Sequence, residues 1–226
     1  DTALPSAGMQ AIPDQIVRQL PQESLRPNKP VTQLHGNKVT TSDGEVIEAK
    51  HIIVALDADQ AVALAGADLE FNWSQTITLH YISPEPPERE PILILNGDGK
   101  GPVNHLSVQT NVSSDYSPDN SSLVCASVLG CPEMPDEDVN RSVQNQMREW
   151  FGPQVSQWKL LDLRRVRKVL TLGRPSRERA QTDLKSQAES IVFAGDYLDT
   201  PSINGAIHSG LRAAEDISRK EGVTKK

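Results

Sequence analysis

Cysteine, aromatic residues and long hydrophobic runs are all scarce in this sequence of 226 residues. The two cysteines, Cys125 and Cys131, are too few for a disulfide framework or for a zinc site with four cysteine ligands. We therefore expect free thiols, which favours the cytoplasm or another reducing compartment. The longest uncharged aliphatic run, Ile52–Leu56, is far shorter than the roughly 18 residues of a membrane-spanning helix. We expect no transmembrane segment.

The net charge of the chain argues against a second class of function. The formal net charge of −7 argues against general affinity for nucleic acid. A local excess of basic residues between Lys159 and Arg179 could contact phosphates, but Trp158 is the one aromatic residue beside it. A solvated or interdomain charged surface is therefore the preferred interpretation. Hydrophobic residues make up 37% of the sequence and prolines number 16, which predicts a folded core with many loops.

The hydrophobic pattern predicts a mixed α+β fold. Helical spacing predicts a helix over 11–20, and a continuous apolar run predicts a buried strand over 51–56, followed by a helix that Asp57 caps. The predicted strands are 31–34, 38–41, 46–48, 76–83, 92–95, 103–111, 123–129, 157–172 and 191–194, and the other predicted helices are 136–150, which Asp136 caps, and 202–219. We interpret the middle of the chain, 57–187, as a domain inserted between two flanking pieces, 1–56 and 188–226.

The segment from Ile191 to Ala214 carries the strongest chemical signal. It reads as a strand, an acidic Gly195-Asp196 turn, a loop and then a helix, with the turn at the strand end where α/β sheets bind ligands. The Asp196 carboxylate can accept a hydrogen bond from a sugar or ribityl hydroxyl. Ser202 can cap the helix, which leaves free amides over Ile203, Asn204 and Gly205 that stabilise negative charge on a ligand. The small residues Gly205 and Ala206 would let a flat ring approach the backbone.

The same helix also has a purely structural interpretation. Its apolar residues recur at helical spacing, and small residues allow close packing of a helix against a sheet. Only the order of strand, Gly-Asp turn and Ser-Ile-Asn-Gly-Ala helix start favours a ligand site over simple packing. This segment resembles the C-terminal flavin motif of the superfamily that contains the FAD-dependent amine oxidases, protoporphyrinogen oxidases and phytoene desaturases.

The resemblance extends over most of the chain. Leu4–Pro13 looks like a Gly-Met segment of the superfamily, and Lys29-Pro30-Val31 looks like the strand whose valine contacts adenine through its backbone. The resemblance therefore implies that Val31 contacts adenine and that Asp196 binds the ribityl or phosphate region of FAD. It further implies that the helix start faces the pyrimidine edge of the flavin ring. The implied FAD-binding residues are Val31, Gly195, Asp196, Ser202, Ile203, Asn204, Gly205 and Ala206.

Two departures from the superfamily shape the expected function. No Gly-x-Gly-x-x-Gly motif occurs, and the glycines of 97–101 read as a turn, so we expect the N-terminal Rossmann unit to lie upstream of Asp1. The strand 76–83 offers Thr76, Thr78 and His80 where some amine oxidases have a lysine, which puts amine oxidation itself in doubt. No cysteine stands where a covalent flavin link would need it, so the implied FAD is noncovalent.

The sequence therefore predicts part of an FAD-dependent oxidoreductase, with a substrate-binding domain over 57–187 and pieces of an FAD domain on either side. The predicted reaction is hydride transfer from a small organic substrate, hydrophobic or an amine, to flavin. Two alternatives stay open, a redox-neutral FAD-dependent isomerase and a noncatalytic binding module. We expect the 226-residue chain alone to bind FAD weakly or not at all, and we expect no metal. The sequence points to no particular catalytic residue.

Overall fold

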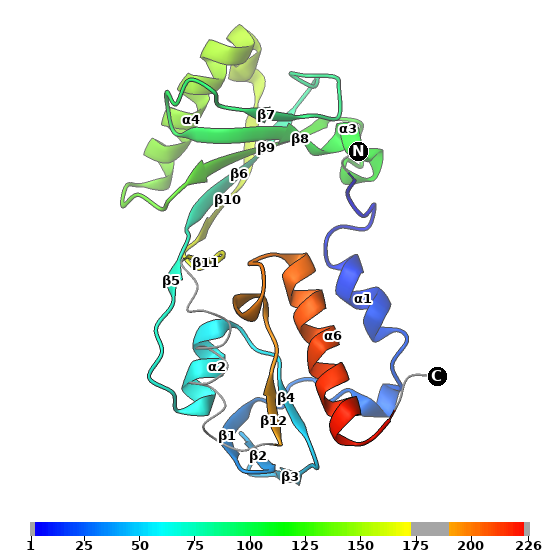
Figure 1. Cartoon of the computed structure of the whole chain (residues 1–226). Coiled ribbons are helices and arrows are strands. Elements are labelled where there is room, and N and C mark those ends of the chain that lie inside the picture. The colour runs from blue at the N-terminus through cyan, green and yellow to red at the C-terminus, as the bar shows by residue number, and fades with distance from the viewer. Residues whose placement is uncertain (1–2, 173–189, 224–226) are drawn as a thin grey trace. The chain divides into compact units, whose positions relative to one another are not determined.

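The computed structural model describes residues 3–172 and 190–223 (Figure 1). The chain divides into two compact units that alternate along the sequence. Unit 1 contains Asp1–Leu25 and Gln75–Val169, and unit 2 contains Arg26–Ser74 and Leu170–Lys226. Both units combine helices with strands, which confirms the predicted α+β class.

Unit 1 is built on an antiparallel five-stranded sheet. Side chains along Thr76–Ser83 alternate between buried and partly exposed, because one face of this strand packs on the core. The short helices of unit 1 are α1 (Ala11–Val17) and α3 (Gln109–Val112), and its long helix is α4 (Asp136–Phe151). In spatial order the strands are β10 (Lys159–Val166), β6 (Thr76–Ser83), β9 (Ser122–Leu129), β8 (Val103–Val108) and β7 (Leu93–Leu95).

The core of unit 1 lies between one face of this sheet and α4. Ile77, Leu79 and Tyr81 alternate along β6 and are fully buried, and they pack with Val143 and Met147 of α4 in one apolar cluster. A helix with apolar residues at this spacing presents one apolar stripe to the sheet. The opposite face of the sheet is therefore the one that remains for a ligand or solvent.

Unit 2 combines a small meander with a parallel strand pair. The antiparallel meander consists of β1 (Val31–His35), β2 (Lys38–Thr41) and β3 (Val46–Glu48). The parallel pair is β4 (Ile52–Val54) with β12 (Ile191–Phe193). The remaining elements are α2 (Ala58–Ala65), α6 (Ile203–Lys220) and the short pair β5 (Asn72–Trp73) with β11 (Thr171–Leu172).

Several predicted elements need correction. The predicted strand over 157–172 is two strands, β10 and β11, and the first helix ends at Val17. The predicted strand over 51–56 is regular only over β4, and Ile53 within it is 42% exposed, so β4 is not buried on both faces. Asp57 does cap α2 by accepting from the Gln60 amide at 3.0 Å, whereas Asp136 is the first residue of α4 and pairs with Arg165 instead of capping.

The predicted domain boundaries differ from the two units. Residues 1–25 belong with the five-stranded sheet, and residues 57–74 belong with the meander. The end of the predicted insertion, near 187, lies outside the described residues. The functions assigned to these pieces stay predictions.

Candidate functional site

The Gly195–Ala206 segment connects β12 to α6 in unit 2. Ser202 caps α6, since its Oγ accepts a hydrogen bond from the Gly205 amide at 3.1 Å. The predicted cap is therefore confirmed, but the predicted set of free amides is too large because the Gly205 amide is already bound. Within the part of the chain that the structure describes, no acceptor meets the amides of Ile203 and Asn204. These two amides are the ones left to donate to a ligand at the positive end of the helix dipole.

Three contacts fix the loop before α6. The Gly195 amide donates to the buried Ser209 Oγ at 3.0 Å, which joins the end of β12 to the second turn of the helix. Asp199 pairs with Arg212, and both side chains are partly buried. The Thr200 carbonyl lies against the Cα of Gly205. Such contacts hold the free amides in a fixed direction before a ligand arrives.

The two glycines of the segment serve packing inside the protein. A Cβ on Gly205 would lie 1.8 Å from the Thr200 oxygen, and a Cβ on Gly195 would lie 2.1 Å from the Tyr197 ring. From the sequence, Gly205 is expected to make room for a flat ring. In the structure a glycine is required at position 205 for packing, because the backbone of Thr200 fills the space where a side chain would lie. Ala206, Asn204 and Ile203 are exposed.

Asp196 follows β12 directly and is half-buried. Burial raises the pKa of its carboxyl, and hydrogen bonds from the backbone amides of Tyr197 and Asp196 itself oppose this effect. A partly desolvated carboxylate gains from a neutral hydroxyl donor and is repelled by phosphate. The local environment thus suits a sugar-like hydroxyl better than a pyrophosphate.

A second feature of unit 2 is a pocket of about 690 Å³ that contains Val31. The pocket lies between the start of the meander, β4 and α2, and its size is within the range of ordinary ligand pockets. Lys29 is the one charged residue among the described residues that line it. The others are Pro30, Val31, Thr32, Leu34, Val39, Ile52, Ile53, Val54, Ala55, Leu56, Gln60, Ala63 and Leu64.

The two features meet at the parallel strand pair. Val54 lines the pocket and pairs with Phe193, and the Ala194 amide donates to the Val54 carbonyl at 2.9 Å. Gly195 and Asp196 follow Ala194 directly in the chain. Val31 lies on β1, in a different sheet from β12, so Val54 of β4 is the residue that links the pocket to the start of the Gly195–Ala206 segment, and the residues of that segment do not line the pocket.

The open face of the unit 1 sheet carries polar side chains that the sequence analysis mostly missed. Thr78 and His80 were considered there as possible counterparts of a lysine. The alternation of side chains along β8 and β9 could have suggested which residues of those strands share the open face. Only the strand register shows which of them lie beside Thr78 and His80. Two adjacent rows cross the sheet, His80–Cys125–Ser107 and Thr78–Ser127–His105.

These rows differ from an ordinary solvated face. Ser127 is buried, and the His80 Nδ1 atom is buried without a partner among the described residues. Burial raises the pKa of the Cys125 thiol, so this cysteine stays protonated near neutral pH and is a poor nucleophile. The side chains of these rows can both donate and accept hydrogen bonds.

The remaining candidates lead to no site. Both cysteines are free, as expected. Residues 3–172 and 190–223 contain no group of His, Cys, Asp or Glu side chains that could hold a metal. The same ranges contain no helix that is both long and apolar enough to cross a membrane. His208 is exposed on α6, and Ser209 is occupied by the Gly195 amide.

The sequence profile of the family described as flavin containing amine oxidoreductase matches residues 1–218. The chain belongs to this flavin-containing amine oxidoreductase family. The resemblance inferred from the Gly195–Ala206 segment is thereby confirmed, and membership implies a flavin cofactor. No curated protein matches the sequence.

Solved structures show the same fold as this chain. The protein from Exiguobacterium sp. 255-15 assigned as a protoporphyrinogen oxidase superposes with a TM-score of 0.75 at 16% identity, over 95% of this chain and 52% of that one. Reduced UDP-galactopyranose mutase gives 0.72 at 16% identity, over 97% and 52%. Cyclohexylamine oxidase from Brevibacterium oxydans IH-35A gives 0.66 at 14% identity, over 95% and 53%. The chain spans about half the length of each of these structures.

The chemistry of these residues fits a flavin cofactor. The unpartnered amides of Ile203 and Asn204 suit the electron-rich edge of the ring, and the half-buried Asp196 suits a hydroxyl of the chain beside it. The mostly apolar pocket at Val31 suits an uncharged heteroaromatic group.

Proposed function

We propose that this chain forms the substrate-binding domain and part of the FAD domain of an FAD-dependent oxidoreductase that binds its cofactor noncovalently. The observation that carries the proposal is the fixed start of α6, where two amides without described partners follow a half-buried carboxylate. When bound, the flavin would supply a hydride acceptor for an organic substrate. The amides of Ile203 and Asn204 would stabilise negative charge on the ring edge, and Asp196 would accept a hydrogen bond from a ribityl hydroxyl.

The parallel strand pair supports an incomplete FAD domain. Parallel sheets are usually larger than two strands and are covered on both faces. Among the described residues, β4 and β12 pair only with each other, and Ile53 is 42% exposed. An apolar stripe on α6 is also uncovered, with Ile203, Ile207 and Leu211 exposed by 53%, 43% and 59%. We propose that a dinucleotide-binding β-α-β unit pairs with this sheet and packs on this stripe in the whole protein.

The substrate side of the proposal rests on the open face of the five-stranded sheet. The rows around His80 and Ser127 offer hydrogen-bonding groups, and Leu93 and Leu95 on the adjoining strand are 54% and 66% exposed. This mixture favours a mainly apolar organic substrate with one hydrogen-bonding group. The superfamily fold also serves a mutase, so a redox-neutral isomerase is the second candidate.

The test uses the whole protein, purified with its cofactor. Anaerobic mixing with a substrate library should bleach the flavin absorbance stoichiometrically for an oxidoreductase. Turnover that requires reduced flavin but no electron acceptor would support the isomerase instead. A whole protein that contains no flavin and restores none on incubation with FAD would contradict both and leave a binding module.

Asp196→Asn tests the site itself. The change removes a desolvated charge, so the folded protein should be at least as stable as the unsubstituted protein at neutral pH, whereas flavin content after gel filtration should fall. Asp216→Asn, at the other end of α6 where Asp216 pairs with Arg219, is the matched control and should keep its flavin. Normal flavin retention by the Asp196 variant would remove this residue from the proposed site.

A further inference from the structure

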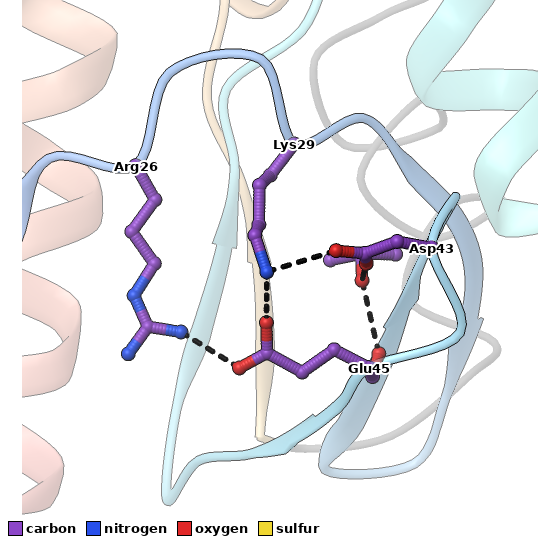
Figure 2. A network of polar contacts seen from close by, with 5 residues as sticks. Arg26, Lys29, Asp43 and Glu45 are labelled. Carbon is purple, nitrogen blue, oxygen red and sulfur yellow. Dashed lines mark hydrogen bonds and ion pairs between the residues drawn. The ribbon is translucent and has the colours of Figure 1, made fainter.

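A network of charged side chains joins the start of β1 to the turn between β2 and β3 (Figure 2). Lys29 Nζ lies 3.0 Å from Asp43 Oδ2 and forms an even closer pair with Glu45. Arg26 binds the other oxygen of Glu45 at 2.9 Å. The two cations thus precede the first strand of the meander, and the two carboxylates come from the turn two strands further along.

The carboxylates are themselves held in place. Thr41 is buried, and its hydroxyl donates to Asp43 Oδ1 at 2.5 Å and lies 3.2 Å from the Glu45 carbonyl. The backbone is joined at the same point, since the Ser42 amide donates to the Pro30 carbonyl at 2.8 Å. The turn is therefore a fixed support, and the cations bind to it.

The network sits beside the apolar pocket at a place where regular structure is weak. Asn28 has a φ of 62°, in the left-handed region, and the pairing of β1 with β2 shifts register between Val31 and Gln33. Lys29, Pro30 and Val31 line the pocket. Because the ladder is irregular just after Val31, the side-chain contacts of Lys29 add to the Ser42–Pro30 backbone hydrogen bond in holding this part of the pocket wall.

The network also determines the charge that the pocket presents. Lys29 is the one charged residue among the described lining residues, and its ammonium is bound by two carboxylates. The Glu45 carboxylate, and after it Asp43, raises the pKa of Lys29. A cation neutralised in this way has little attraction left for a phosphate.

We propose that Lys29 is a positioning residue, which holds Pro30 and Val31 in the pocket wall by pairing with Asp43 and Glu45. Because its ammonium is held by these carboxylates, the pocket selects an uncharged ring such as adenine over a phosphate. This inference rests on the proposed role of Val31 in cofactor binding. It adds the residues that set the shape and the selectivity of the pocket.

The experiment compares four variants of the 226-residue chain. Lys29→Met and Glu45→Gln break the network, whereas Lys29→Arg keeps the positive charge. Lys38→Met is the matched control, because Lys38 pairs with Glu48 at 3.4 Å in the same meander and does not line the pocket. Backbone amide exchange over 31–34 reports the wall without any ligand, and titrations with adenosine and AMP followed by NMR report its selectivity.

We expect Lys29→Met and Glu45→Gln to speed exchange over 31–34 and weaken adenosine binding by about three- to fivefold, the scale of a partly exposed ion-pair network. Lys29→Arg should restore both, and Lys38→Met should change neither. The proposal would be overturned if amides 31–34 exchanged at the same rate in Lys29→Met as in Lys38→Met. It would also be overturned if the unsubstituted chain bound AMP more tightly than adenosine. If adenosine perturbs no pocket amide in that chain, the adenine role of Val31 fails, and the exchange comparison still decides whether Lys29 holds the wall.

Discussion

Replacing Gly205 by alanine tests whether the start of α6 is fixed by contact with its own loop. The new Cβ would lie 1.8 Å from the Thr200 oxygen, 2.8 Å from its carbonyl carbon and 3.0 Å from its nitrogen. All three atoms are backbone, so no side chain can rotate away. Either the loop or the first turn of α6 has to move.

The expected size of the effect follows from two opposing contributions. Alanine in place of glycine favours a helix by about 1 kcal/mol, and less near the helix end. Forcing an extra methyl group into a packed site costs about 1–3 kcal/mol. We therefore expect Gly205→Ala to lower the free energy of unfolding by about 1–2 kcal/mol. The displaced loop should also reduce flavin retention in the whole protein.

The control is the same substitution five residues further along the same helix. A Cβ on Gly210 would meet nothing within 4 Å, so Gly210→Ala should raise stability by about 0.5–1 kcal/mol. Urea denaturation followed by circular dichroism, with amide exchange in α6, compares the two variants. If Gly205→Ala unfolds at a urea concentration equal to or above that of Gly210→Ala, the contact with Thr200 does not determine this site.

Three further outcomes are expected. The buried Tyr197 hydroxyl has no partner among the described residues, so Tyr197→Phe should leave the thermal midpoint unchanged or raise it. Tyr81→Phe, by contrast, removes a 2.7 Å hydrogen bond to Asn140 and should cost about 1 kcal/mol in a urea titration. The Thr41 hydroxyl and then Lys29 lower the pKa of Asp43 to about 2. The stability from Asp43 should be complete above its ordinary pKa near 3.9 and decline as the pH falls toward 2, and an acid titration of Asp43→Asn should lack that decline.

Local patterns predicted the local elements well. Alternation in 76–83 gave β6 with its bounds, and Asp57 and Ser202 were recognised as caps because a cap acts on an amide three residues away. Asp136 was misassigned by one residue since Pro135 precedes it and α4 starts on the aspartate itself. Its carboxylate is engaged by Arg165, 29 residues later in the sequence, which no local pattern reveals.

Properties that depend on distant segments could not be predicted. The apolar run around β4 reads as a strand buried on both faces, yet Ile53 is 42% exposed because the described residues leave its face of the strand partly uncovered. The sequence shows the run but does not show what covers it. The polar rows on the five-stranded sheet were missed for a related reason. Cys125 becomes the neighbour of His80 only through the pairing of β6 with β9.

The glycines show most clearly how the structure changes the argument for the site. A Gly-Asp turn and a glycine in the first turn of a helix suggested room for a ring, and that inference used only the absence of a side chain. In the structure Gly195 makes room for Tyr197, and Gly205 makes room for the Thr200 carbonyl. Neither glycine therefore needs a ligand to explain it. The groups that a ligand can use are instead the amides of Ile203 and Asn204, held in a fixed direction by the Ser202 cap and the packed loop. The case for flavin at α6 thus rests on donors without acceptors, which is a stronger basis than empty space because unsatisfied amides favour an electron-rich partner.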